Sequence, residues 1–120
     1  MPRSFAIVGT AVALSIAAAA LGTTNASAAS PSKAAVAALV AHERAQGNND
    51  VEHPDCYIIG AWAQCTFGTG HGNAEVNAWL HLKGGTWRFL GEGGGVTFAS
   101  MLEQQYGIPA PIAKKFQAKQ

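Results

Sequence analysis

Apolar and polar residues alternate through the middle of the chain, and this alternation predicts β-strands. Between Ala74 and Lys83 every second residue is apolar, while most of the residues between them are polar. Residues 57–67 show the same period of two, which continues in phase on both sides of Gly60. Successive side chains of a strand point to opposite faces, so both segments are typical of strands with one buried face.

Gly84 and Gly85 predict a two-residue hairpin turn that leads into a third strand, residues 86–90. Two glycines supply the positive φ angles that such a turn requires. The turn also fixes the register, in which apolar residues face apolar ones. The expected pairs are Lys83 with Thr86, Leu82 with Trp87, His81 with Arg88, Leu80 with Phe89 and Trp79 with Leu90.

The register of the first two strands follows if residues 68–73 join them directly. The pairs expected from that connection are Ala63 with Ala78, Cys65 with Val76 and Trp62 with Trp79.

Three helices are expected around this meander. The first, residues 33–46, begins after Ser30-Pro31-Ser32, and its apolar residues recur at helical spacing. A second helix is predicted over 97–106, capped by Thr97, and a third over 112–119. The second is expected to pack through Phe98, Met101, Leu102 and Tyr106. The predicted fold is an α+β domain with an N-terminal helix, a three-stranded antiparallel meander and two short C-terminal helices, all helices lying on one face.

Residues 1–28 have the pattern of a secretory signal peptide. A basic start precedes an apolar segment, 5–21, and small residues at 26–28 form a site typical of signal peptidase. An uncleaved membrane anchor is the alternative, which the shortness of the apolar segment disfavours. We therefore expect a secreted or periplasmic protein with no membrane attachment after signal removal, and one small domain over residues 29–120.

The charge balance excludes one class of partner. Only 12% of the residues are charged, and the formal net charge is +1. This composition provides no basic surface for a phosphate backbone, so we expect no nucleic-acid partner.

Cys56 and Cys65 leave two interpretations open. An exported protein with an even number of cysteines usually pairs them. A continuous strand over 57–67 would instead hold the two Cα atoms about 30 Å apart, whereas a disulfide requires less than about 7 Å. Either the strand folds back at Gly60 and the cysteines pair, or the thiols stay free or pair between chains. The unbroken alternation favours the continuous strand.

The face that the helices leave open in this arrangement has an aromatic centre and a polar rim, as protein interfaces have. We therefore expect it to bind a protein partner or a second copy of the chain. The alternative is that a helix folds over this face and makes it core, because Trp is mostly buried. The residues expected on this face are Trp62, Trp79, Leu90, Gln64, Asn77, His81 and Arg88.

The four histidines form no evident metal motif. Copper and zinc sites need imidazoles that converge, generally with thiolates or carboxylates. His42 lies on the first helix, His53 and His71 fall in loops at opposite ends of the first strand, and His81 lies within the second strand. Scattered, solvated histidines are therefore expected, and the candidates for a metal test are His71, His81 and His53.

No combination of residues indicates catalysis, and a non-enzymatic protein is expected. A nucleophilic Ser, Cys or Thr would need a base oriented by a third group, and the sequence shows no such arrangement. No pairing in an apolar setting that would raise a carboxyl pKa is expected for Asp50, Glu52, Asp55, Glu75, Glu92 or Glu103.

Landmarks between residues 57 and 116 resemble those of the copper uptake system-associated proteins, which are small exported bacterial proteins, and their uncharacterised relatives. The landmarks are Tyr57, Trp62-Ala63-Gln64, Ala78, Leu80, Gly85, Trp87, the glycine cluster 91–95, Tyr106-Gly107-Ile108-Pro109 and Ala113. The resemblance implies an extracytoplasmic accessory to copper or other metal handling, with copper as the ligand. Such relatives often carry a Cys shortly after the third strand, where this chain has Gly91-Glu92.

Three hypotheses follow from the sequence. The first is an exported non-enzymatic protein that binds a partner or itself through the sheet face. The second is the metal-handling accessory implied by the resemblance. The third is a small hydrolase or peptidase inhibitor.

Overall fold

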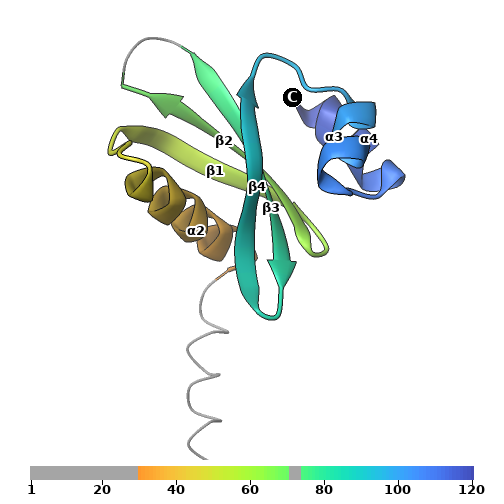
Figure 1. Cartoon of the computed structure of the whole chain (residues 1–120), viewed down its shortest axis with the longest axis horizontal. Coiled ribbons are helices and arrows are strands. Elements are labelled where there is room, and N and C mark those ends of the chain that lie inside the picture. The colour runs from red at the N-terminus through yellow and green to blue at the C-terminus, as the bar shows by residue number, and fades with distance from the viewer. Residues whose placement is uncertain (1–29, 71–73) are drawn as a thin grey trace, which may run out of the picture. The chain divides into compact units, whose positions relative to one another are not determined.

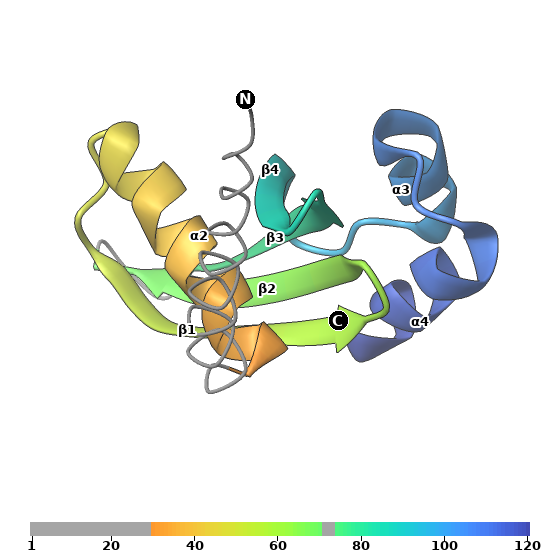
Figure 2. The same ribbon diagram turned by 90° about the horizontal axis from the view of Figure 1, so that it is seen from below.

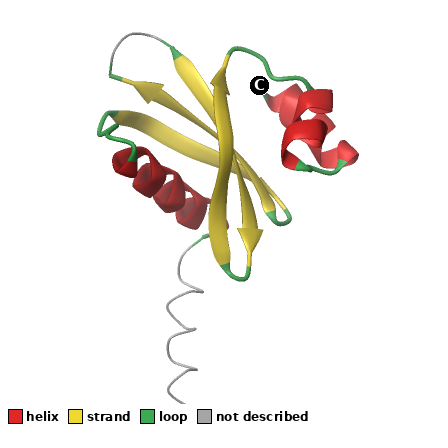
Figure 3. Ribbon diagram, in the orientation of Figure 1, coloured by secondary structure: helices red, strands yellow, loops and turns green. Residues whose placement is uncertain are grey.

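The computed structural model describes residues 30–70 and 74–120. These residues form a four-stranded antiparallel sheet and three helices (Figure 1, Figure 3), so the predicted α+β class is confirmed. The elements are α2 Pro31–Ala45, β1 Val51–Ile59, β2 Trp62–Thr69, β3 Glu75–Lys83, β4 Thr86–Gly94, α3 Ala99–Tyr106 and α4 Ala110–Lys119. The strands lie side by side in chain order. The predicted signal peptide and His71 lie outside the described residues.

The segment predicted as one strand, residues 57–67, is a hairpin made by β1 and β2, so the prediction of three strands was wrong. The chain turns at Gly60 and Ala61, and Gly60 has a φ of 61°. A glycine with positive φ at the first turn position is typical of a two-residue hairpin loop. The alternation concealed this turn because β1 carries apolar residues on both faces, with Ile58 in one core and Ile59 in the other.

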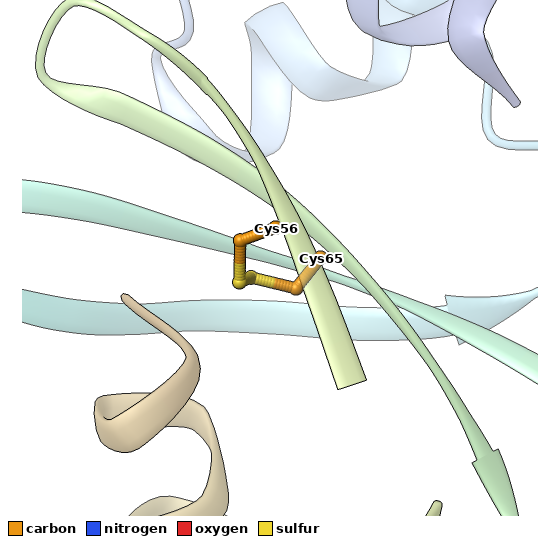
Figure 4. The surroundings of a disulfide bond; sticks show 2 residues. All are labelled: Cys56 and Cys65. Carbon is orange, nitrogen blue, oxygen red and sulfur yellow. A yellow bond between two sulfur atoms is a disulfide. The ribbon is translucent and has the colours of Figure 1, made fainter. Parts of the chain in front are cut away.

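The hairpin places Cys56 directly opposite Cys65, and the two form a disulfide with Cα atoms 3.9 Å apart (Figure 4). The expectation of a continuous strand with unpaired thiols was therefore wrong, and the paired alternative is correct. Both cysteines are buried and belong to the cluster beneath α2.

The register between β2 and β3 differs from the predicted one by two residues. Trp62 pairs with His81 rather than with Trp79. A shift of two residues preserves the faces of both strands, so the two indoles still lie on the same face. Ala63 likewise pairs with Leu80 rather than with Ala78, and Cys65 pairs with Ala78 rather than with Val76.

The β3–β4 hairpin has the predicted register from Lys83–Thr86 to Leu80–Phe89 and then departs from it. Trp79 pairs with Gly91 rather than with Leu90. The register shifts at this point because Leu90 is an extra residue on β4, which forms a β-bulge.

Helices cover both faces of the sheet, so the predicted arrangement with all helices on one face was wrong. Figures 1 and 2 show α2 on one side of the strands and α3 with α4 on the other. Beneath α2 the first core cluster includes Leu39, Ala63, Cys65, Phe67, Leu80 and Trp87. The second cluster, formed with α3 and α4, includes Trp79, Leu102, Ile108, Ala113 and Phe116.

The N-terminus of α3 is capped by α4 rather than by Thr97. The helix begins at Ala99, and the preceding Phe98 makes no side-chain cap bond. The Ala99 N–H donates to Gln117 Oε1 at 2.7 Å, and the Thr97 N–H donates to Gln120 Oε1 at 2.7 Å. Gln117 thus accepts one of the N–H groups that a helix start leaves unpaired, and Gln120 accepts the N–H of Thr97 just before the helix.

Candidate binding surface

The seven residues predicted to bind a partner share one sheet face, and α3 and α4 cover only part of it. Three of them are buried, with exposed fractions of 2% for Gln64, 7% for Asn77 and 1% for Trp79. The remaining four keep part of their surface in solvent, and they are Trp62, His81, Leu90 and Arg88. The two alternatives for this face, core and open surface, therefore each describe one part of it.

Trp79 is part of the core because its polar and aromatic groups both have partners there. Its Nε1–H donates to Gln64 Oε1 at 2.8 Å, and the Tyr106 ring stacks on the indole at a centroid distance of 5.7 Å. Gln64 in turn donates through Nε2 to the carbonyl oxygen of Phe116 at 2.9 Å. A buried amide that satisfies both an indole N–H and a backbone carbonyl joins α4 to the sheet.

Asn77, on β3, is buried on the same face and lies near the end of β4. Its Nδ2 donates to the Gly95 carbonyl at 3.4 Å, whereas its Oδ1 has no hydrogen-bond partner among the described residues. Because Asn77 is only 7% exposed, it does not belong to the part of this face that solvent reaches.

One register row across the sheet stays partly in solvent on this face, and its Trp62 also packs against the second core cluster. Ile59 pairs with Trp62, Trp62 with His81, and His81 with Arg88. We call Trp62, His81 and Arg88 the open row. The rings of Trp62 and His81 stack at a centroid distance of 3.9 Å with an interplanar angle of 10°. The row therefore presents a flat aromatic pair beside an exposed guanidinium.

The open row carries groups that can make contacts typical of protein interfaces. A guanidinium binds carboxylates through paired hydrogen bonds, and aromatic rings supply rigid contact area. Lys83 lies on the same face two residues beyond His81, and residues 76–91 contain no acidic side chain. The end of the β3–β4 hairpin is consequently basic, and it favours a ligand that carries carboxylates.

Phe98 and Met101, which the prediction turned inward, are exposed instead, and Val96 is exposed beside them. The exposed fractions are 62% for Val96, 57% for Phe98 and 42% for Met101. Because α3 begins only at Ala99, Phe98 does not follow the helical spacing on which the predicted stripe depended. The helix instead buries Ala99 and Leu102.

A pair of carboxyl groups, which the sequence did not reveal, lies on the opposite sheet face. Glu43 of α2 is only 4% exposed, and Glu92 lies on β4, opposite Ala78. Partial burial of its carboxyl, a hydrogen bond with Glu43 and the charge of Glu43 raise the pKa of Glu92 from its ordinary value of 4.5 to about 7. The prediction that Glu92 has no carboxyl partner was therefore wrong. Helix α2 and strand β4 are far apart in sequence, so no local pattern could indicate the pair.

The described histidines lie in separate places. His42 stacks on Phe89 at a centroid distance of 3.6 Å, beneath α2, and His81 belongs to the open row. His53 is exposed on β1 and adopts a positive φ of 49°. Within the described part of the chain, no group of three His, Cys, Asp or Glu residues is arranged to hold a metal ion.

No family model matches the chain, and comparisons with curated proteins and with solved structures give no match either. Among the described residues, no helix combines the length and apolar character needed to cross a membrane.

Proposed function

We propose that this protein is an exported, non-enzymatic binding domain that engages a protein partner through the open row. The single observation that carries the proposal is the stacked, partly exposed Trp62–His81 pair with Arg88 beside it in register. Trp and Arg are the residues that most often dominate the energy of protein interfaces. The basic hairpin end supports a partner segment that contains Asp or Glu.

Export is proposed on separate grounds. The signal-peptide pattern of residues 1–28 supports it, and a disulfide such as Cys56–Cys65 persists in oxidising compartments outside the cytoplasm. The mature protein is then expected to begin at Ala29, which intact-mass measurement of the secreted product can establish.

Site-specific photocrosslinking tests the binding proposal. A photoreactive amino acid at position 62, in protein expressed in its own host, is expected to form an adduct of defined mass. The matched control carries the same amino acid at Ala41, which is exposed on α2 across the sheet. Adducts of equal yield from positions 62 and 41 would contradict the proposal.

Affinity for the partner identified in this way then measures the role of each side chain. We expect Trp62→Ala and Arg88→Ala each to weaken binding about 10- to 30-fold, as truncation of central interface residues does. Arg44→Ala, an exposed substitution on α2, is the control and should leave the affinity unchanged. If the adduct contains a second copy of this chain, sedimentation of the wild type and of Trp62→Ala will identify the partner as the protein itself.

A further inference from the structure

Strand β4 forms one edge of the sheet. The strands lie in chain order, so β4 and β1 are at opposite sides of the sheet and each is paired on one side only (Figure 2). Among residues 30–70 and 74–120, no backbone hydrogen bond joins residues 86–94 to a segment other than β3. The unpaired N–H and C=O groups of such an edge can pair with a further strand.

The register between β3 and β4 shows which backbone groups point outward. Lys83 and Thr86 pair across a two-residue turn, and the register is regular from that pair to Phe89. In such a hairpin the pair next to the turn exchanges both backbone hydrogen bonds, and bonded and non-bonded pairs then alternate. Trp87 and Phe89 therefore turn their N–H and C=O groups away from β3.

The opposite edge, β1, is unsuited to an added strand. Pro54 has no N–H to donate, and His53 adopts a positive φ of 49°. The register with β2 also shifts between Glu52 and Asp55. Proline and an irregular register protect the edges of natural sheets from further pairing. Residues 86–90 of β4 contain neither proline nor glycine, so this segment is the edge that can accept a strand.

The charges beside β4 indicate which kind of strand fits there. Arg88 is exposed and pairs with His81, so the open row ends at the outer edge of β4. Lys83 is exposed on the same face, and residues 76–91 contain no acidic side chain. A strand added to β4 places one residue directly opposite Arg88, with its side chain on the same face. Because opposite charges stabilise such a cross-strand pair, Asp or Glu suits this position.

The two neighbouring positions of the added strand face apolar side chains. Trp87 belongs to the first core cluster, and Phe89 is half-buried against that cluster. Residues opposite these two would lie on the α2 face of the sheet, where apolar side chains extend the cluster. The edge is thus complementary to an extended segment in which an acidic residue lies between two apolar ones.

We propose that the partner contributes such a segment, which adds to β4 as a fifth strand, an inference that rests on the proposed function. Asp or Glu of the segment lies opposite Arg88, and apolar residues lie opposite Trp87 and Phe89. Backbone hydrogen bonds to Trp87 and Phe89 hold the segment, and the pair with Arg88 selects its charge. The open row then continues from Arg88 onto the partner.

A synthetic peptide tests this mode of pairing on the full mature chain. The probe has nine residues, alternating Ser and Val with blocked ends, and its central Ser is replaced by Glu. The control peptide has Lys at the centre. In an NMR titration we expect the Glu peptide to bind about tenfold more tightly than the Lys peptide, because the central charge lies opposite Arg88. Hydrogen exchange should slow at the Trp87 and Phe89 amides and change little at the Thr86 and Arg88 amides, which are already bonded to β3.

Charge reversal on the protein tests whether Arg88 selects the segment. Arg88→Glu should prefer the Lys peptide. Arg44→Glu, at an exposed site on α2, is the matched control and should keep the preference of the wild type. An unchanged preference in Arg88→Glu would overturn the assigned register.

The possible failures can be told apart. No binding of the Glu peptide at millimolar concentration, or binding that leaves the Trp87 and Phe89 amides unprotected, would overturn the added strand, and a specific adduct from position 62 would then still support the proposed function. Peptide binding as expected without such an adduct would contradict the proposed function alone. Protection of the two amides that rises with protein concentration in the absence of peptide would assign the edge to a second copy of the chain and overturn the acidic segment.

Discussion

At the residue scale, Trp62 and Trp79 have different roles although they share one face of the sheet. Trp79 is 1% exposed and stacks on Tyr106, whereas Trp62 remains partly exposed and stacks on His81. The difference comes from position, because the cluster formed with α3 and α4 encloses Trp79 and contacts only part of the Trp62 ring.

This difference predicts unequal effects of truncating the two indoles. Trp79→Ala should reduce the free energy of unfolding by about 3–5 kcal/mol, since it removes a buried ring. Trp62→Ala should cost less, about 1–2 kcal/mol, because its ring is partly exposed and packs only at the margin of the second core cluster. Urea unfolding of both variants measures the two losses. Losses of equal size would mean that the open row belongs to the core.

Gly91 shows a residue requirement that only the packing explains. It pairs with Trp79 next to the bulge, and a Cβ atom added to it would lie 2.7 Å from Tyr106 Cζ. Real Cβ contacts are not this short, so the Tyr106 ring could not keep its place on Trp79. The glycine permits α3 to lie directly on the sheet.

At the element scale, the β1–β2 hairpin is joined by its disulfide and covered by α2. Cys65 is 0% exposed and Cys56 is 7% exposed. The ladder between the strands and the packing of α2 also hold the hairpin together, so the disulfide is not its only constraint.

We expect the Cys56→Ser, Cys65→Ser double variant to fold and to lose stability. The two cysteines are nine residues apart, for which loop-closure entropy gives a loss of about 2.5 kcal/mol in the free energy of unfolding. Urea unfolding of the variant beside the oxidised wild type measures it. An unchanged midpoint would mean that the bond does not constrain the unfolded chain.

The sequence near α3 predicted where this helix ends but not where it begins. The stop of α3 at Gly107, with a φ of 70°, follows from glycine alone and was predicted in the right place. Its start was misplaced because the accepting oxygens belong to Gln117 of α4 and to Gln120, the residue after α4. When the capping groups come from residues outside the helix, the sequence near the start of the helix does not indicate where it begins.

At the scale of the whole molecule, stability should fall as pH rises. Glu92 has a pKa of about 7 in the folded protein and an ordinary value of 4.5, so between these values the folded state holds a proton that the unfolded state has released. The free energy of unfolding therefore decreases across this interval. The effect is moderated because Glu92 is exposed.

Urea unfolding at pH 5 and pH 8 measures this dependence. The wild type should have the lower midpoint at pH 8, and the difference should shrink in Glu92→Gln. A wild-type midpoint that is higher at pH 8 would show that other groups determine the pH response.

The sequence by itself determined the α+β class, the β3–β4 hairpin and the shared face of Trp62 and Trp79. These features depend on turn glycines and on a side-chain period of two, both of which act between residues close in the chain. The tertiary structure decided the rest: the fold-back at Gly60 with its disulfide, the helices on both faces, the division of the predicted surface into core and open row, and the meeting of Glu43 with Glu92. The fold-back was not predicted because β1 carries apolar residues on both of its faces, so the alternation did not reveal the turn. The other features depend on segments that pack together although they are far apart in the sequence.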